Sequence, residues 1–328
     1  MGQFDTMAKK YLADNARFAD AFNFKIYGGR QVLKAENLRE MDTTEIVLPY
    51  GNDAKAPLQK FRDVMKIYSA RHDDKVVYIV LGLEAQANLH YAMPVRNMLY
   101  DAMNYARQVG NAAKSYRKTS EGLRGDEYLS GFAKDDNIMP VVTLVLSFTD
   151  EPWDAPTSLH EMFTGIDEEV LALVPDYKIN LLSPSDIDDE EFANFVTELG
   201  SVLQFVKHQN DEDMDWLSGN EERFEQVDFE SAEMIKFLTG VEIGEKKGES
   251  VNMCRAWANS LEKARKEARE EAWQEAYNEC EQKMGDAVSV ATLTMIRNAM
   301  ESFHLTAKEA MDGLKISAAE QARYAAQL

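Results

Sequence analysis

The sequence predicts an α/β fold built on a mixed sheet, and three features of the chain indicate it. Residues 76–81 form a short, continuously apolar and largely β-branched run, which is typical of a strand covered on both faces. Pro94 stands where a helix prefers its first residue, and apolar side chains recur at helical spacing as far as Gln108. Residues 139–148 form a second apolar run. Helices and strands in this order favour a mixed sheet covered by helices.

Further elements are predicted before the central strand. Residues 4–24 have the apolar spacing of one helix, which Gly28 and Gly29 end. Residues 32–38 form a short element, and residues 44–48 are predicted as the first strand. Residues 61–69 are predicted as the second strand, whose period-two side chains are apolar except for Asp63. An acid on an otherwise buried face is an exception that calls for a reason.

The segment after the Pro94 helix is polar at first and then returns to strands and helices. Residues 111–134 are predicted as a loop or mobile flap. Residues 177–182 are predicted as the last strand, and residues 190–205 as a helix with an apolar face. The first domain is therefore expected to span residues 1–205.

Composition limits the class of protein. The chain has 328 residues, a formal net charge of −21 and a sequence pI near 4.7, which argues against non-specific coating of DNA but allows a local basic groove. Two cysteines without zinc-type spacing favour a reduced, cytoplasmic protein. The first residues do not resemble a signal peptide, and no apolar run reaches membrane-spanning length.

The strand of residues 76–86 ends in chemistry-bearing side chains. Glu84 and Gln86 are two residues apart, so they leave the strand on the same face. A carboxylate at the end of a core strand is costly to desolvate unless a metal ion, water or another partner compensates it. Asp63 and Glu84 lie on consecutive strands joined by a tight turn. Antiparallel pairing of these strands would place both carboxylates within reach of one cation.

The remainder of the chain is expected to be helical. Residues 206–250 are predicted as an acidic linker or helical extension, and residues 251–328 as a helical region. Within it, residues 251–284 combine strong helix formers with a thin apolar stripe of Trp257, Leu261 and Trp273. This pattern is compatible with a stalk for self-association into a homo-oligomer and equally with a long surface helix.

Shorter helices are predicted after Gly285, at residues 288–303 and 306–314. Thr306 with Glu309, and Ser317 with Glu320, have the spacing of a capping box. Helix-turn-helix modules have this organisation, as do many helical tails that do not bind DNA.

An ordered set of segments resembles a known nuclease family. The set comprises Phe18–Asn23, Arg62-Asp63-Val64, Glu84-Ala85-Gln86, Met93-Pro94-Val95-Arg96 with Tyr100-Asp101, Pro140–Val145, and Trp153. Together these segments are similar to the Rpn family of recombination-promoting, transposase-like nucleases, an E-x-Q variant of the PD-(D/E)XK superfamily. The resemblance covers residues 4–203.

The resemblance implies a restriction-endonuclease-like αβββαβ core and a metal-dependent DNA endonuclease. Asp63 and Glu84 would then bind Mg²⁺, a hard cation that takes carboxylate oxygens. Gln86 occupies the place where the broader superfamily has Lys, so Arg96 is the candidate for the missing positive charge. Asp20 resembles the acid that many of these nucleases carry on the first helix.

Other residues rank lower. Asn23 is a second polar candidate on the first helix, and Glu45 is a weaker one. Tyr100 and Tyr105 are expected to pack, and His90 to lie on a surface loop. The alternative function is a protein that kept the fold but lost cleavage, acting as a DNA-associated scaffold or a self-assembling interaction protein. The acidic balance and the absent Lys motivate this alternative.

Overall fold

The computed structural model describes residues 3–41, 44–47, 58–61, 63–72, 75–119, 123–211, 215–217, 221–243, 248 and 250–328. The chain forms two compact units, Met1–Asn259 and Ser260–Leu328. The structure therefore divides the chain at Asn259, whereas the sequence analysis placed boundaries after residues 205 and 250.

The first unit contains a five-stranded mixed sheet with the strand order β1-β4-β5-β6-β7. The strands are β1 (Leu38–Glu40), β4 (Val64–His72), β5 (Lys75–Gln86), β6 (Val141–Ser147) and β7 (Asn180–Leu182). β4 is antiparallel to β1 and β5, and β6 is parallel to β5 and β7. The predicted α/β class with a mixed sheet and a helical C-terminal region is confirmed.

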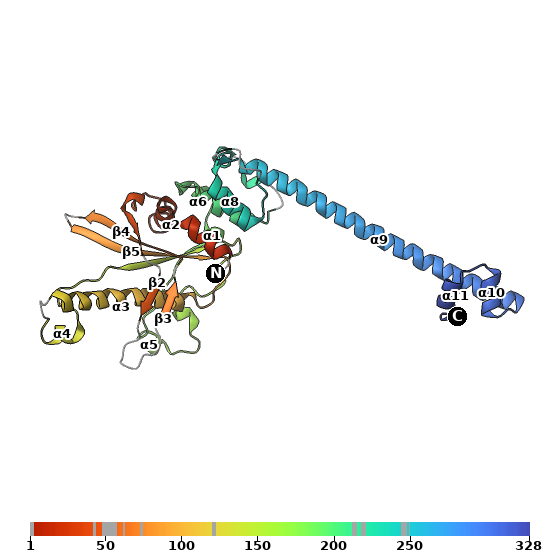
Figure 1. The fold of residues 1–328 in the computed structure, drawn as a ribbon, viewed down its shortest axis with the longest axis horizontal. Helices are drawn as coiled ribbons and strands as arrows, with labels where there is room; N and C mark the ends of the chain where they lie inside the picture. Colours follow the sequence, from red (N-terminus) through yellow and green to blue (C-terminus); the bar gives the residue numbers. More distant parts are fainter. Residues whose placement is uncertain are drawn as a thin grey trace. The chain divides into compact units, whose positions relative to one another are not determined.

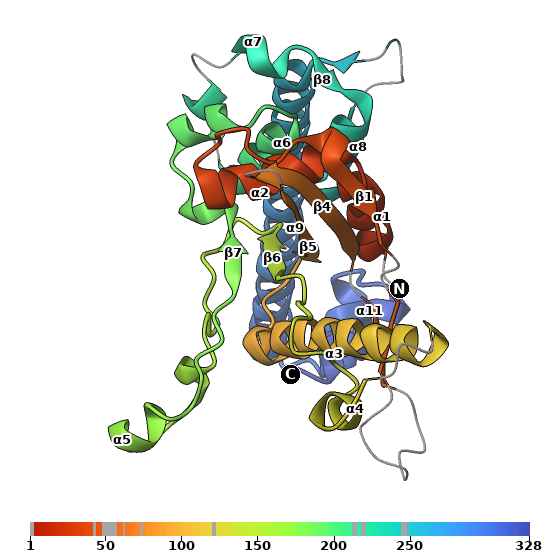
Figure 2. The ribbon, with the colours of Figure 1, turned by 90° about the vertical axis from the view of Figure 1, so that its left-hand side faces the viewer.

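Strand β5 is the centre of this sheet, and it has the character that its apolar run predicted. Its side chains Val80, Leu81 and Leu83 are almost completely buried. Figures 1 and 2 show helices α1 (Gln3–Leu12) and α2 (Asn15–Tyr27) on one side of β4 and β5, and α3 (Met93–Thr119) on the other side. Helices thus cover both faces of the sheet, which explains why β5 is apolar at successive positions.

The first predicted helix is two helices. The chain turns at Ala13, and Asp14 then caps α2 by accepting hydrogen bonds from the backbone N–H groups of Ala16 and Arg17. An aspartate at this position satisfies N–H groups that have no partner within the helix. Helix α2 ends at Gly28, whose φ of 61° is left-handed, as the predicted glycine stop requires.

The predicted first strand belongs to a separate sheet. Among the residues that the structure describes, strand β2 (Thr44–Val47) pairs with β3 (Leu58–Phe61) in an antiparallel two-stranded sheet. The first strand of the main sheet is instead β1, where Leu38 is buried opposite Tyr68. The prediction of one strand over residues 61–69 was wrong at its start, because β3 ends at Phe61 and β4 begins at Val64.

The segment predicted as a loop, residues 111–134, is largely helical. Helix α3 extends to Thr119, and α4 (Asp126–Ser130) follows. Alanine, lysine and arginine after Gly110 are strong helix formers, so a single glycine does not end α3. The predicted helix at residues 190–205 is also divided, into the 3-10 turn η4 (Asp189–Asn194) and helix α6 (Leu199–Lys207).

The described residues between α6 and Asn259 belong to the first unit and include short helices. They include α7 (Glu221–Phe224), α8 (Phe229–Thr239) and the small sheet of β8 (Val227–Asp228) with β9 (Ser250–Val251). Four aromatic rings meet edge to face, those of Phe205, Trp216, Phe224 and Trp257. Short elements complete this unit: η1 (Ala35–Asn37), η2 (His160–Met162), α5 (Glu168–Leu171), η3 (Pro184–Asp186) and η5 (Asp215–Leu217).

Helix α9 (Met253–Phe303) is 51 residues long and continues into the second unit. It passes through Gly285, where the sequence analysis expected an end. Helices α10 (Ala307–Gly313) and α11 (Ala318–Ala325) pack on it around four buried side chains, Ile296, Ala310, Met311 and Tyr324. The predicted capping box of Thr306 and Glu309 is confirmed. In the second predicted box, the Ser317 hydroxyl donates to the Glu320 carboxylate but does not cap the backbone of α11. Among the described helices, none combines the length and apolarity needed to span a membrane.

Candidate functional site

The site begins with the pairing of β4 and β5. Val64, the first residue of β4, lies opposite Leu83 in this antiparallel pair, and Asp63 directly precedes it. Because β4 begins only at Val64, it does not extend along β5 as far as Ala85. The Asp63 carboxylate accepts the backbone N–H of Ala85 at 2.8 Å. This side chain therefore gives the Ala85 N–H an acceptor beyond the end of β4.

Glu84 is completely buried and forms an ion pair with Arg96. The distance between Arg96 Nη2 and Glu84 Oε2 is 3.0 Å. Arg96 belongs to the first turns of α3, and its Nε donates to the hydroxyl of the buried Tyr100 at 3.3 Å. Burial lowers the pKa of Arg96, but the negative charge of Glu84 and the bond to Tyr100 raise it more, so its net pKa lies above the usual value. The ion pair therefore favours the charged form of the Arg96 guanidinium.

A cavity of about 440 Å³ opens beside this ion pair. The polar side chains that line it include those of Asp5, Asp63, Gln86, His90 and Arg96. Glu84 is not part of its wall, although Arg96 is. Arg96 therefore lies between the cavity and the buried carboxylate.

Electrostatics within the cavity act most clearly on Asp63. Burial raises the pKa of Asp63, while the Ala85 N–H and the charge of Arg96 lower it by less. The nearby negative charge of Asp5 raises it further. The net pKa lies above the usual aspartate value, which is the expected direction for an acid that is buried beside another acid.

Asp5 is the site residue that the sequence analysis missed. It lies in the first turn of α1, where an acid is ordinarily explained by its favourable interaction with the helix dipole. The sequence contains no signal that distinguishes this acid from a simple helix-end residue. Its place at the cavity results from the packing of α1 beside the end of β5.

Asp20, predicted as the first-helix acid of the site, does not line the cavity. Asp20 is completely buried and accepts hydrogen bonds from the N–H groups of Val196 and Thr197 and from the Thr197 hydroxyl. It therefore holds the turn that separates η4 from α6. Asn23 is also structural, since its side chain accepts the Leu33 N–H at 2.8 Å and donates to the Leu33 carbonyl at 2.9 Å.

The remaining candidates have different outcomes. Gln86 lines the cavity, and its Nε2 donates to the carbonyl of Ala85 at 2.9 Å. Tyr105 packs near the sheet core as expected, and its hydroxyl accepts the Val141 N–H at 3.1 Å. Glu45 lies in β2, and its side chain is outside the described residues.

His90 was expected on a surface loop, but the structure half-buries it in the cavity wall. It also lines a second cavity of about 380 Å³, together with Val95, Arg96, Leu99 and Tyr100. Within the described part of the chain, His90 Nδ1 is buried without a hydrogen-bond partner. Arg96 and His90 thus belong to the walls of both cavities.

The donor atoms at the site suit a hard cation, because they are carboxylate oxygens. The carboxylates of Asp63 and Asp5 line the same cavity, and Glu84 is paired with Arg96, which also lines it. Over the described ranges, however, no three or more His, Cys, Asp or Glu side chains are grouped closely enough to hold a metal ion. The chemical types of these residues therefore suit a divalent cation. In the present arrangement, however, the Glu84 carboxylate binds Arg96.

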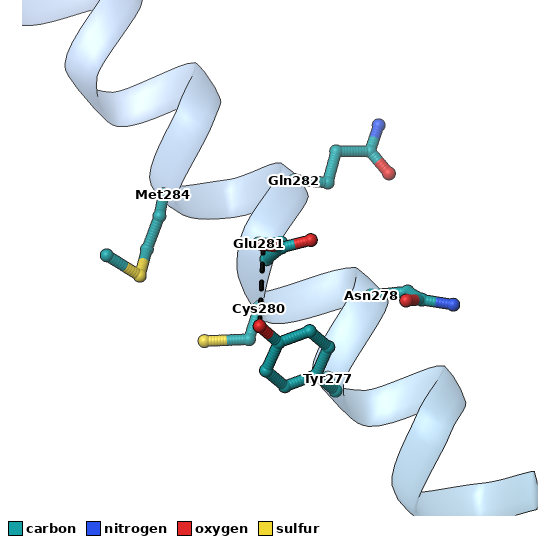
Figure 3. A pocket seen from close by; sticks show the side chains of 6 residues that line it. All are labelled: Tyr277, Asn278, Cys280, Glu281, Gln282 and Met284. Atoms are coloured by element: carbon teal, nitrogen blue, oxygen red, sulfur yellow. Dashed lines mark hydrogen bonds between the residues drawn. The ribbon is translucent and has the colours of Figure 1, made fainter.

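A further hollow, of about 700 Å³, lies along α9 in the second unit (Figure 3). All of the residues that line it come from this one helix, among them Tyr277, Cys280 and Met284. Tyr277 donates to the Glu281 carboxylate at 3.5 Å. This surface contains no group of acids or basic side chains comparable with the end of β5.

The fold and the site define an α/β protein with a helical C-terminal region and a pair of acids at the end of its central strand. Comparisons with protein-family models, with curated proteins and with solved structures find no match to the chain. The function is therefore argued from the site itself.

Proposed function

We propose that the protein is a Mg²⁺-dependent DNA endonuclease, similar to the Rpn nucleases that its sequence resembles. The observation that carries this proposal is the cavity at the end of β5, whose wall includes Asp63 and the Arg96 that is paired with Glu84. Arg96 and Gln86 line the same cavity, so acidic, cationic and amide groups converge. Convergence of these groups in one concave region is what phosphodiester hydrolysis requires.

Each residue has a role in this proposal. Asp63 and Glu84 would hold the cation, with Asp5 nearby as a third acid. When bound, Mg²⁺ supplies polarisation of the phosphate and a lowered pKa of the attacking water. Arg96 would stabilise negative charge that develops on the phosphate, in place of the lysine of related nucleases. Gln86 would donate a hydrogen bond to a phosphate oxygen or orient a water molecule.

The alternative, a nuclease-fold protein that binds DNA or other partners without cleaving, has one observation in its favour. The acids of the described residues are not grouped as metal ligands. Cleavage in the presence of Mg²⁺ separates the two functions.

The test is nicking of a supercoiled plasmid with Mg²⁺ and with a chelator. We expect nicking that depends on Mg²⁺ and that Glu84→Gln abolishes, because the amide keeps the shape of the side chain but not its charge. Glu267→Gln, a matched change at an exposed position of α9, should nick like the wild type. If Glu84→Gln nicks at the wild-type rate, Glu84 does not belong to the catalytic site.

We also propose that α9 mediates self-association, through a different set of side chains from the stripe that the sequence suggested. Trp257 does not need cover from a partner, because it is 3% exposed and packs on Phe205 and Trp216 in the first unit. Trp273 and Met284, in contrast, are 65% and 64% exposed. Large exposed apolar side chains at helical spacing are typical of a helix that pairs with a second copy.

A further inference from the structure

Arg96 connects the cavity of about 440 Å³ at the end of β5, the main cavity, with the buried carboxylate of Glu84. The Glu84 carboxylate is 0% exposed, and Arg96 Nη2 lies 3.0 Å from its Oε2. Arg96 forms part of the cavity wall, and Glu84 does not. A cation that enters this cavity therefore meets the guanidinium before it meets the carboxylate.

A divalent cation and the guanidinium need the same carboxylate. A buried carboxylate requires a counter-charge, because desolvation of an uncompensated charge is costly. Two cations on one carboxylate repel each other strongly in a partly buried site. Occupation of Glu84 by Arg96 and occupation by a divalent cation are thus alternatives.

We propose that Arg96 is a latch: it is the resident counter-cation of Glu84, and it leaves this carboxylate when a divalent cation binds. The proposal rests on the nuclease function proposed above and adds a conformational step to the same site. It also explains why no group of three acids is assembled among the described residues, since Glu84 is directed to Arg96.

The second cavity provides the space for Arg96 after it leaves Glu84. Arg96 lines both cavities, so rotation of its side chain can move the guanidinium from the main cavity into the second cavity without movement of α3. Val95, Leu99 and Tyr100 form apolar walls against which the aliphatic part of Arg96 can pack. Its guanidinium carbon already lies 5.7 Å from the centre of the Tyr100 ring, within the range of a cation–π contact.

Release of Arg96 would couple two events at the site. Once it is no longer bound to Glu84, the guanidinium is available, from the wall shared by the two cavities, to pair with a phosphate. Arginine suits this second role because its planar group recognises phosphate oxygens in two-point geometry. Loading of the cation would thus deliver the positive charge that Gln86 does not provide.

The test is calorimetric titration of the full-length protein with Mn²⁺ at pH 8, without DNA. Arg96→Gln keeps a hydrogen-bond donor for Glu84 but removes the competing charge, so we expect Mn²⁺ to bind about tenfold more tightly or better, which corresponds to about 1.4 kcal/mol. Arg117→Gln is the matched control, since Arg117 is exposed in the last turn of the same helix. It should bind Mn²⁺ like the wild type.

A second pair of proteins shows whether the gain acts through Glu84. In a Glu84→Gln background, Arg96→Gln should no longer tighten Mn²⁺ binding, because the contested carboxylate is gone. Arg96→Met measures the same competition if Arg96→Gln does not fold, as judged by circular dichroism.

The outcomes separate the latch from the proposed function. Equal or weaker Mn²⁺ binding by Arg96→Gln overturns the latch, while Mg²⁺-dependent plasmid nicking would still support the nuclease. Failure of both the wild type and Arg96→Gln to bind Mn²⁺ overturns the latch and the metal site together. A gain that persists in the Glu84→Gln background also overturns the latch, because Arg96 would then act elsewhere.

Discussion

Asp63 has two roles that substitutions can separate. Its carboxylate accepts the Ala85 N–H at 2.8 Å, and we propose that it also binds the cation. Asp63→Ala removes both roles, whereas Asp63→Asn keeps an oxygen that can accept the Ala85 N–H. We expect both variants to lose plasmid nicking and only Asp63→Ala to lose stability.

The magnitude follows from the lost hydrogen bond. A buried backbone donor that loses its acceptor costs about 1–3 kcal/mol, and we expect Asp63→Ala to be destabilised by that amount. For a unit of this size the melting temperature should fall by roughly 2–4 °C per kcal/mol. Differential scanning calorimetry of the wild type and the two variants measures the difference.

The dependence on pH provides a further check. Burial raises the pKa of Asp63, so the folded state favours its protonated form. The corresponding contribution to stability is fully present below the unfolded pKa of about 3.9 and is lost as the pH rises through the higher folded pKa. Asp63→Asn, which resembles the protonated form, should therefore gain stability relative to the wild type as the pH rises above about 4.

Two results would refute this reasoning. Equal melting temperatures for Asp63→Ala and Asp63→Asn would mean that the bond to Ala85 contributes nothing measurable. Full nicking by Asp63→Asn, with contaminating nuclease excluded, would mean that the carboxylate does not bind the cation.

The other predictions concern residues outside the cavity. Asp20→Ala should destabilise the protein by about 2–5 kcal/mol, because the buried N–H groups of Val196 and Thr197 lose their acceptor. Plasmid nicking per folded molecule should not change; thermal unfolding and the plasmid assay measure the two effects. A variant that is stable but inactive would return Asp20 to the site. Trp273→Ser should lower the subunit number measured by light scattering, because it removes exposed apolar surface from α9. The control Gln282→Ser, a change at a polar residue of the same helix, should not lower it. The same particle mass for the two variants would contradict self-association through α9.

Local pattern determined the elements that the sequence analysis predicted well. The continuous apolar run of β5 required a strand covered on both faces, and Pro94 required a helix start nearby; the structure has both. The tight turn between two strands favoured antiparallel pairing, and β4 and β5 pair in this way, with Asp63 directly before β4. These predictions succeeded because each depends on residues that are close in sequence.

Local pattern misled where a long-range contact decides the conformation. Residues 190–205 have the apolar spacing of one helix. However, Asp20, which is distant in the sequence, accepts hydrogen bonds from the N–H groups of Val196 and Thr197, and the helix is divided at these residues. The polar segment from residue 111 and the glycine at position 285 suggested helix ends, yet α3 and α9 continue through Gly110 and Gly285. One glycine costs about 1 kcal/mol in a helix, which strong helix formers on both sides can offset.

The sequence by itself determined the class of fold, the central strand, and the presence of Asp63, Glu84, Gln86 and Arg96 around the end of that strand. Only the tertiary structure decided that Asp5 joins them, that Asp20 and Asn23 serve the scaffold, and that Arg96 binds Glu84 at 3.0 Å. The physical reason is the range of the interactions. Periodicity and caps depend on neighbours along the chain, whereas the ion pairs and cavities of a site depend on how distant helices pack against the sheet.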